Sequence, residues 1–188
     1  MQNNLEKLSD NELFKMLSNG DKEGEYAFLE IYRRYSNRIY AYCKRFLGDR
    51  EDAMDVFQDT FIKFYQTSKD EREMTNLPAF LLRIARNLCL NALRQRRQST
   101  EIEDYMHFIN TEKDNEETEL LNLIKTALSK LPEEYREIFI LREYQGMSYN
   151  EIANHLNISL PLVKVRLFRA KEKLREILAP YITEFSKF

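Results

Sequence analysis

The chain has 188 residues, of which 43% are hydrophobic and 32% charged, and its formal net charge is −2. Only four Gly and four Pro occur, which favours helices over sheets, and the length suits two small domains. There is no apolar run of about eighteen residues and no apolar signal-peptide core near the start, so we expect a cytoplasmic protein without membrane insertion.

The first half of the chain predicts several amphipathic helices separated by short breaks. In order, they span about 10–19, 23–46, 51–67 and 78–97. Asp10 is the expected cap of the first helix, and Gly48 the expected end of the second. Pro78 suits the first turn of the fourth helix, which follows a polar loop at 68–76.

The third predicted helix has a core stripe and an acidic outer side. The stripe consists of Ala53, Phe57, Thr60, Phe61 and Phe64. The outer side holds Asp52, Asp55, Gln58 and Asp59, with Ile62 among them. An apolar residue amid acids suits a protein contact, but a solvated acidic face explains the pattern equally well.

The fourth predicted helix carries two apolar stripes with a basic arc between them. The arc holds Arg83, Arg86, Asn87, Arg94 and Arg97, and no acidic residue occurs in 83–97. A helix packed on two sides with one basic edge indicates an embedded element that presents cations to a polyanion. The alternative is a set of arginines on an ordinary wet surface.

Residues 98–118 lack apolar periodicity and are predicted to form a flexible linker. Eight acids occur in 101–119 against a single lysine, whereas residues 83–97 carry a charge of +5 and residues 158–178 a charge of +4. The small net charge therefore hides two basic blocks that flank an acidic one.

Helical patterning returns from residue 119 to about 178 and predicts a helix-turn-helix. Ser148 and Glu151 form the spacing of a capping box at the start of its first helix. A short turn at 157–159 separates this helix from a second one that starts near Leu160. Breaks are also expected at Leu131-Pro132 and at Gln145-Gly146.

The second helix of this motif separates into two faces on a helical wheel. The packing stripe consists of Val163, Leu167, Ala170 and Leu174. A separate arc holds Lys164, Val165, Phe168 and Arg169. An exposed face of cations and apolar side chains is typical of a helix in the major groove, where cations meet phosphates and guanine edges and apolar atoms meet thymine methyl groups. A helical hairpin in an interaction domain is the alternative.

Residues suited to catalysis or to metal binding do not form recognisable patterns. Cys43 and Cys89 are far apart in apolar helical contexts, so we predict reduced core thiols. His107 and His155 have no partner at ligand spacing, and no Gly-rich phosphate loop occurs. We therefore predict no metal, no cofactor and no enzymatic activity.

Several of these segments together resemble one family in its order and spacing. The segments are 27–35, 52–61, 78–88, 131–143, 146–153 and 163–174. They resemble the second and fourth domains of the extracytoplasmic-function (ECF) sigma factors of bacterial RNA polymerase. The chain departs from the family's usual residues at Phe80 (usually Trp), at Pro161-Leu162 (often Gly-Thr) and at Val165 (often Ser).

The resemblance implies an all-α protein of two small helical domains and assigns roles to individual residues. The domain at 1–97 would bind the polymerase clamp and the promoter's minus-ten element, and the domain at 119–188 would bind the minus-thirty-five element. Implied contacts to the minus-thirty-five element are Arg142, Tyr149, Lys164, Val165, Arg166, Phe168, Arg169 and Lys173. Implied contacts to the minus-ten element are Arg83, Arg86, Asn87 and Arg94. Implied contacts to the polymerase core are Asp52, Asp55, Gln58, Asp59 and Ile62.

The same resemblance implies the partners. They are the polymerase core, through its clamp coiled coil and its flap, promoter DNA, and an anti-sigma factor. The acidic linker would thread toward the polymerase's RNA path and mimic nucleic acid there. Two other hypotheses stay open on the residues alone: a stand-alone helix-turn-helix regulator, and an adaptor whose basic blocks bind acidic proteins.

Overall fold

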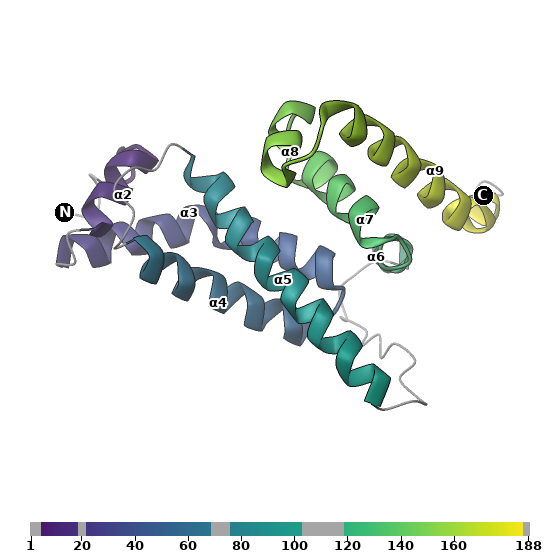
Figure 1. The fold of residues 1–188 in the computed structure, drawn as a ribbon, viewed down its shortest axis with the longest axis horizontal. Coiled ribbons are helices and arrows are strands. Elements are labelled where there is room, and N and C mark those ends of the chain that lie inside the picture. The colour runs from purple at the N-terminus through teal and green to yellow at the C-terminus, as the bar shows by residue number, and fades with distance from the viewer. Residues whose placement is uncertain (1–4, 19–21, 69–75, 103–118, 186–188) are drawn as a thin grey trace. The chain divides into compact units, whose positions relative to one another are not determined.

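The computed structural model describes residues 5–18, 22–68, 76–102 and 119–185, and within them the regular structure is helical with no strand (Figure 1). The elements are α2 (Asp10–Ser18), α3 (Lys22–Leu47), α4 (Arg50–Ser68), α5 (Leu77–Ile102), α6 (Glu119–Ser129), α7 (Glu133–Phe139), the π-helical turn η1 (Ile140–Tyr144), α8 (Tyr149–Leu156) and α9 (Leu160–Phe185). The predicted all-α class is confirmed. The chain divides into two compact units, one of residues 1–44 and 49–94 and one of residues 95–188 with 45–48.

The first unit packs α2, α3, α4 and α5 around a core rich in aromatic rings. Phe64 of α4 lies at the centre: its ring centroid is 6.2 Å from that of Phe14 in α2 and 6.2 Å from that of Phe80 in α5. Phe28 of α3 stacks on the same ring at 6.5 Å. Burial of each such side chain contributes about 1.5–3 kcal/mol. One phenylalanine on α4 thus joins all four helices, with Phe80 in the position where the resembled family has Trp.

The start of α2 differs from the expectation, because Ser9 rather than Asp10 caps this helix. The Ser9 amide donates to Glu12 Oε2 at 2.7 Å, and the Glu12 amide donates to Ser9 Oγ at 3.3 Å. Asp10 instead accepts hydrogen bonds from α3, from the Tyr35 hydroxyl at 2.5 Å and from Arg34 at 3.1 Å. The acid mistaken for a cap therefore ties α2 to α3.

The beginning of α5 agrees closely with the prediction, whereas its end does not. The Asn76 side chain accepts from the Ala79 amide at 3.0 Å, so an asparagine caps the helix just before Pro78. The helix continues to Ile102 instead of ending near residue 97. The rest of the predicted linker, 103–118, and positions 69–75 of the predicted loop lie outside the described residues. Cys43 and Cys89 are both buried, as predicted, and no disulfide joins them in the part of the chain that the structure describes.

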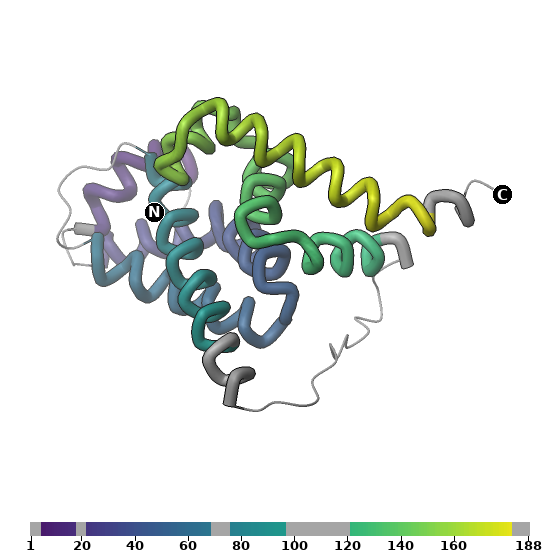
Figure 2. The backbone as a smooth tube through the Cα atoms, turned by 45° about the vertical axis from the view of Figure 1, so that its right-hand side comes forward, coloured from purple at the N-terminus to yellow at the C-terminus, as the bar shows by residue number. Residues whose placement is uncertain are grey.

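In the second unit the shorter helices pack against α9, the long yellow-green helix of Figure 2. The core cluster of α6 and α9 consists of Ala127, Leu128, Leu131, Ala170 and Leu174. Val163 and Leu167 are buried as well, so the predicted packing stripe of α9 is confirmed. The predicted breaks also hold: Pro132 precedes α7, Gly146 has φ 68° and Asn157 has φ 53°.

Two features of this unit could not be anticipated from the pattern of apolar residues. The helix that begins as α7 widens into η1, where the Gln145 amide donates to the Ile140 carbonyl at 3.1 Å. The last helix also continues through Pro180 to Phe185 instead of ending near residue 178.

Among the described residues, no helix combines the length and the apolar character that crossing a membrane requires.

Candidate nucleic-acid interface

The helix-turn-helix of α8 and α9 is held by hydrogen bonds at both ends of α8. At the start, the Ser148 amide donates to Glu151 Oε2 at 2.7 Å and the Glu151 amide donates to Ser148 Oγ at 3.2 Å, which confirms the predicted capping box. At the end, Asn157 adopts the left-handed conformation, and the Ile158 amide donates to the Ala153 carbonyl at 3.0 Å. Both ends of α8 are thereby fixed, and the left-handed Asn157 at its end sets the direction in which the chain continues toward α9.

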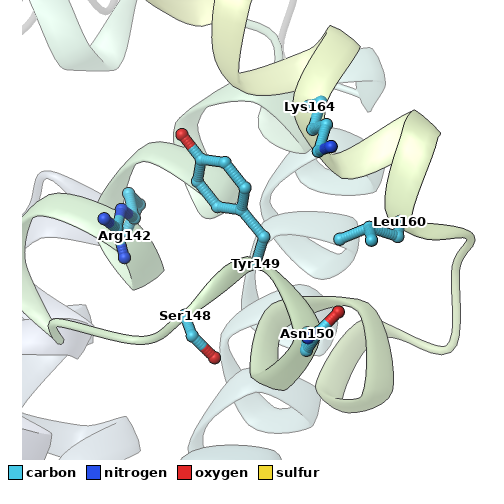
Figure 3. A pocket seen from close by; sticks show the side chains of 6 residues that line it. All are labelled: Arg142, Ser148, Tyr149, Asn150, Leu160 and Lys164. Carbon is cyan, nitrogen blue, oxygen red and sulfur yellow. The ribbon is translucent and has the colours of Figure 1, made fainter.

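A hollow of about 360 Å³ lies where η1, α8 and α9 meet (Figure 3). It is lined by Arg142, Ser148, Tyr149, Asn150, Leu160 and Lys164. Figure 3 shows the Tyr149 ring between the side chains of Arg142 and Lys164, which come from η1 and α9. Two cations beside the amino-terminal end of a helix make a favourable site for an anion such as a DNA phosphate.

Arg142 is positioned by its neighbours in this hollow. One of its terminal nitrogens donates to the Met147 carbonyl at 2.8 Å, and its guanidinium lies 5.0 Å from the centre of the Tyr149 ring. The hydrogen bond and the cation–π contact orient the charge without neutralising it. Arg142 and Tyr149, both predicted as phosphate contacts, therefore lie in contact with each other, and both line the hollow.

The outer face of α9 carries the predicted arc of mixed cations and apolar side chains. Lys164 and Arg169 are exposed, and Val165 and Phe168 retain 45% and 64% of their accessible surface. One guanidinium nitrogen of Arg169 donates a hydrogen bond to the Tyr135 hydroxyl oxygen of α7 at 3.5 Å, and this bond raises the pKa of the arginine. The arc is on the side opposite the buried stripe, so it is available to a partner.

Two other cations of α9 form ion pairs inside the unit. Arg166 pairs with Glu134 of α7, and Lys171 pairs with Glu143 of η1 at 2.8 Å. Only 26% of the Arg166 side chain is exposed, so this predicted DNA contact is oriented toward α7. Lys173, also predicted as a DNA contact, is exposed further along the helix. The DNA-binding role of both residues stays a prediction.

In the first unit, α5 presents the predicted basic edge. Arg83, Asn87 and Arg94 are exposed and Arg86 is half-buried, whereas Leu81 on the inner side is fully buried. The Arg83 guanidinium lies 5.4 Å from the centre of the Phe80 ring, so the core aromatic residue also supports a surface cation. The edge is therefore a row of polar and charged groups on a firmly packed helix.

The acidic face of α4 is exposed as expected and is continued by a neighbouring helix. Asp55, Gln58, Asp59 and Ile62 are exposed, Asp52 is half-buried, and the predicted core stripe on the other side is buried. Ile62 keeps 55% of its accessible surface.

Sequence reasoning missed the contribution of α3 to this surface. Leu29 and Tyr32 are 59% and 39% exposed, and the Tyr32 ring lies 4.8 Å from that of Phe61 on α4. Leu29 directly follows Phe28 on α3, and Ile62 directly follows Phe61 on α4. The ring centroids of Phe28 and Phe61 are 6.4 Å apart. The signal in the sequence was an apolar residue, Leu29, on the outer side of an amphipathic helix. We call Leu29, Tyr32 and Ile62 the α3–α4 apolar surface.

Comparison with protein families gives two matches that together extend over most of the chain. Residues 31–99 match the family described as sigma-70 region 2, and residues 121–174 match sigma-70, region 4. The first match includes α4 and most of α5, and the second includes η1, α8 and most of α9.

Individual proteins agree with these matches. The RNA polymerase sigma-H factor of Pseudomonas aeruginosa is 31% identical in an alignment of 189 positions, which covers 93% of this chain and 96% of that protein. The ECF RNA polymerase sigma factor SigE of Mycolicibacterium smegmatis is 31% identical in an alignment of 172 positions, which covers 88% of this chain and 66% of that protein. Among solved structures, the sigma factor RpoE of Bartonella quintana, in complex with the anti-sigma factor NepR, is similar with a TM-score of 0.70 and 25% identity, over 81% of this chain and 96% of that one.

Proposed function

The chain belongs to the extracytoplasmic-function RNA polymerase sigma factors, and we propose from this that it binds the polymerase core and directs it to promoters through one DNA-binding surface in each unit. The observation that carries the proposal is the outer face of α9, where Lys164, Val165, Phe168 and Arg169 are exposed beside the hollow at the start of α8. Relatives of this chain are initiation factors, and we infer that it acts in the cytoplasm without catalysing a reaction of its own.

The second unit supplies the contacts to the minus-thirty-five element. In a helix-turn-helix the second helix enters the major groove by its amino-terminal part, while the first helix crosses the backbone. Lys164 and Arg142 flank Tyr149 at the start of α8, which suits one phosphate at the edge of the groove. The exposed arc of α9 then faces the bases.

The first unit supplies the contacts to the minus-ten element through the basic edge of α5. Melting requires bases to leave the stack, and capture of an extruded base compensates for a few kcal/mol of lost stacking. Asn87 is exposed on this edge and has an amide that can donate to and accept from a base. Arg83, Arg86 and Arg94 would hold the phosphates on either side of it.

The α3–α4 apolar surface and the acids of α4 form the proposed contact to the polymerase clamp. Exposed aliphatic and aromatic residues at the centre of a polar rim are the usual composition of a protein interface. Ile62, Leu29 and Tyr32 form such a centre, and Asp55 and Asp59 form part of the rim. The second unit would contact the flap.

An anti-sigma factor is a further proposed partner. The similar Bartonella quintana protein was solved in complex with one. Co-purification of this chain with a co-expressed candidate inhibitor, followed by loss of core binding, tests this part of the proposal.

The decisive test is reconstitution of the chain with bacterial core polymerase, followed by sequencing of the transcript starts on a genomic library. We expect a defined set of starts that core polymerase alone does not produce, each preceded by two shared sequence elements. Starts identical to those of core alone would overturn the proposal. The stand-alone regulator, the other candidate, predicts tight specific DNA binding without core, which an electrophoretic mobility shift separates from the sigma-factor behaviour.

A further inference from the structure

The outer face of α9 is apolar at its centre, although the helix as a whole is basic. Pro161, Val165 and Phe168 follow one another at helical spacing on the side opposite the buried Val163 and Leu167. Val165 and Phe168 are 45% and 64% exposed. Among the residues of the second unit that the structure describes, no packed element covers these side chains. Together they form what we call the α9 apolar stripe.

Charged side chains border this stripe and limit its length. Lys164 lies along one edge and Arg169 along the other, and both are exposed. Glu172 comes one turn after Phe168 on the same side and is exposed too. Arg166 does not reach this face, because it pairs with Glu134. A ligand for the stripe must therefore be anionic at its edges and apolar where it meets Val165 and Phe168.

The major groove of DNA meets these requirements only where thymine occurs. Among the four bases, thymine alone presents an apolar group there, its C5 methyl, whereas the other base edges present hydrogen-bonding groups. Val165 and Phe168 have no side-chain polar atom to satisfy such groups, so burying them against guanine, cytosine or adenine is unfavourable. Phosphates on both sides of the groove suit Lys164 and Arg169.

The spacing along the helix indicates how many thymines are involved. Val165 and Phe168 are separated by about 4.5 Å along the axis of an α-helix. Successive base pairs are separated by about 3.4 Å. Two side chains at this separation meet neighbouring base pairs, so the stripe matches a step of two thymines and not a single one.

We propose that Val165 and Phe168 are specificity-determining residues that read two neighbouring thymines in the minus-thirty-five element through their C5 methyl groups. The inference rests on the proposed function, because it names the DNA sequence class that the same helix recognises. The resembled family often has Ser at the position of Val165. We infer that the valine shifts the preference at this position toward a methyl-bearing base.

The test uses the reconstituted holoenzyme and a promoter library randomised in the minus-thirty-five region. We expect bound promoters to share a step of two thymines on one strand. Each of these thymines is then replaced by deoxyuridine, which removes only the methyl group. Loss of one buried methyl corresponds to about fourfold weaker binding, so we expect roughly fourfold per position, measured by competition with the unmodified promoter.

Two variants connect the effect to the stripe. Val165→Thr exchanges a methyl for a hydroxyl at nearly equal volume, and we expect it to lose much of the discrimination between thymine and uracil. Leu121→Thr alters an exposed apolar residue of α6, outside the stripe, and should discriminate as the unaltered chain does. The uracil experiment itself uses the unaltered protein, so misfolding of a variant cannot explain its result.

The possible outcomes separate this inference from the proposed function. If the holoenzyme selects an element without neighbouring thymines, or binds the uracil promoters as tightly as the thymine ones, methyl reading is disproved while promoter recognition stands. If the library yields no enriched element and transcription does not depend on the chain, both proposals fail.

Discussion

Arg166 of α9 and Glu134 of α7 form an ion pair with an N–O distance of 2.5 Å, so a cation within the basic helix neutralises an acid of its own domain. Lys171, five residues later on α9, forms a second such pair with Glu143 of η1. The basic residues of α9 therefore form two groups. Arg166 and Lys171 pair with acids of α7 and η1 and help to orient the helix, whereas the other group faces outward. Lys164 and Arg169 belong to the outward group.

The first prediction concerns the strength of the Arg166–Glu134 pair. Its side chains are 26% and 46% exposed, and pairs with this degree of solvent contact typically contribute about 0.2–1 kcal/mol. We expect a double-mutant cycle with Arg166→Ala and Glu134→Ala to give a coupling energy in this range, measured by urea unfolding. A coupling near zero would show that the two side chains act independently in solution.

The second prediction concerns pH and Glu30, which is buried between two arginines. Hydrogen bonds from Arg33 and Arg34 lower the pKa of Glu30 to about 2, against the opposing effect of burial. Because the folded-state pKa is below the ordinary value of 4.5 for a glutamate, the stabilisation is present above about pH 4.5 and is lost as pH falls toward 2. It amounts to about 3 kcal/mol at most, at 1.36 kcal/mol per pKa unit.

Glu30→Gln tests this expectation. The variant should be less stable at neutral pH and should lose part of the decline in stability between pH 5 and 2, as followed by urea unfolding at each pH. Glu23→Gln, at an exposed position of the same helix, is the matched control and should keep the decline. Parallel pH profiles for Glu30→Gln and the unaltered chain would show that Glu30 is not the group responsible.

The third prediction concerns the α3–α4 apolar surface. Leu29→Ser and Ile62→Ser remove apolar groups that are 59% and 55% exposed, so each should change stability by less than about 0.5 kcal/mol. If these residues are at the centre of the polymerase contact, each should weaken core binding by about tenfold or more, a loss of roughly 1.4 kcal/mol. Titration of fluorescently labelled chain with core polymerase measures the affinity.

The matched control for this surface is Leu121→Ser, which changes an equally exposed leucine on α6. It should leave core affinity unchanged. Equal losses in all three variants would attribute the effect to a general change in the surface and not to this contact.

The fourth prediction concerns Lys164 and the salt dependence of promoter binding. If its ammonium group contacts one phosphate at the hollow beside Tyr149, Lys164→Gln should lower the slope of log K against log salt by about 0.9. The affinity should fall for all promoter sequences alike, because a phosphate carries no sequence information. Lys130→Gln, at an exposed position before α7, should leave the slope unchanged. A loss confined to particular bases would assign Lys164 to base reading instead.

The sequence determined which helices form and which of their sides are buried. Apolar spacing identified the buried stripes of α4 and α9, and local signals such as Ser148 with Glu151, Gly146 and Asn157 determined the limits of α8. These signals are readable because a helix and its caps depend on residues within about four positions of one another. The joint order of the motifs was sufficient to predict the family.

The tertiary structure decided which charged residues remain available to a partner. Glu134 and Arg166 are 32 positions apart and Asp10 and Tyr35 are 25 apart, so no local pattern reveals either pairing. The same holds for the packing of Phe28 of α3 against Phe61 of α4, the residues that directly precede the exposed Leu29 and Ile62. A residue's exposure and its ion-pair partners depend on which residues lie near it in space. Only the folded chain determines those neighbours.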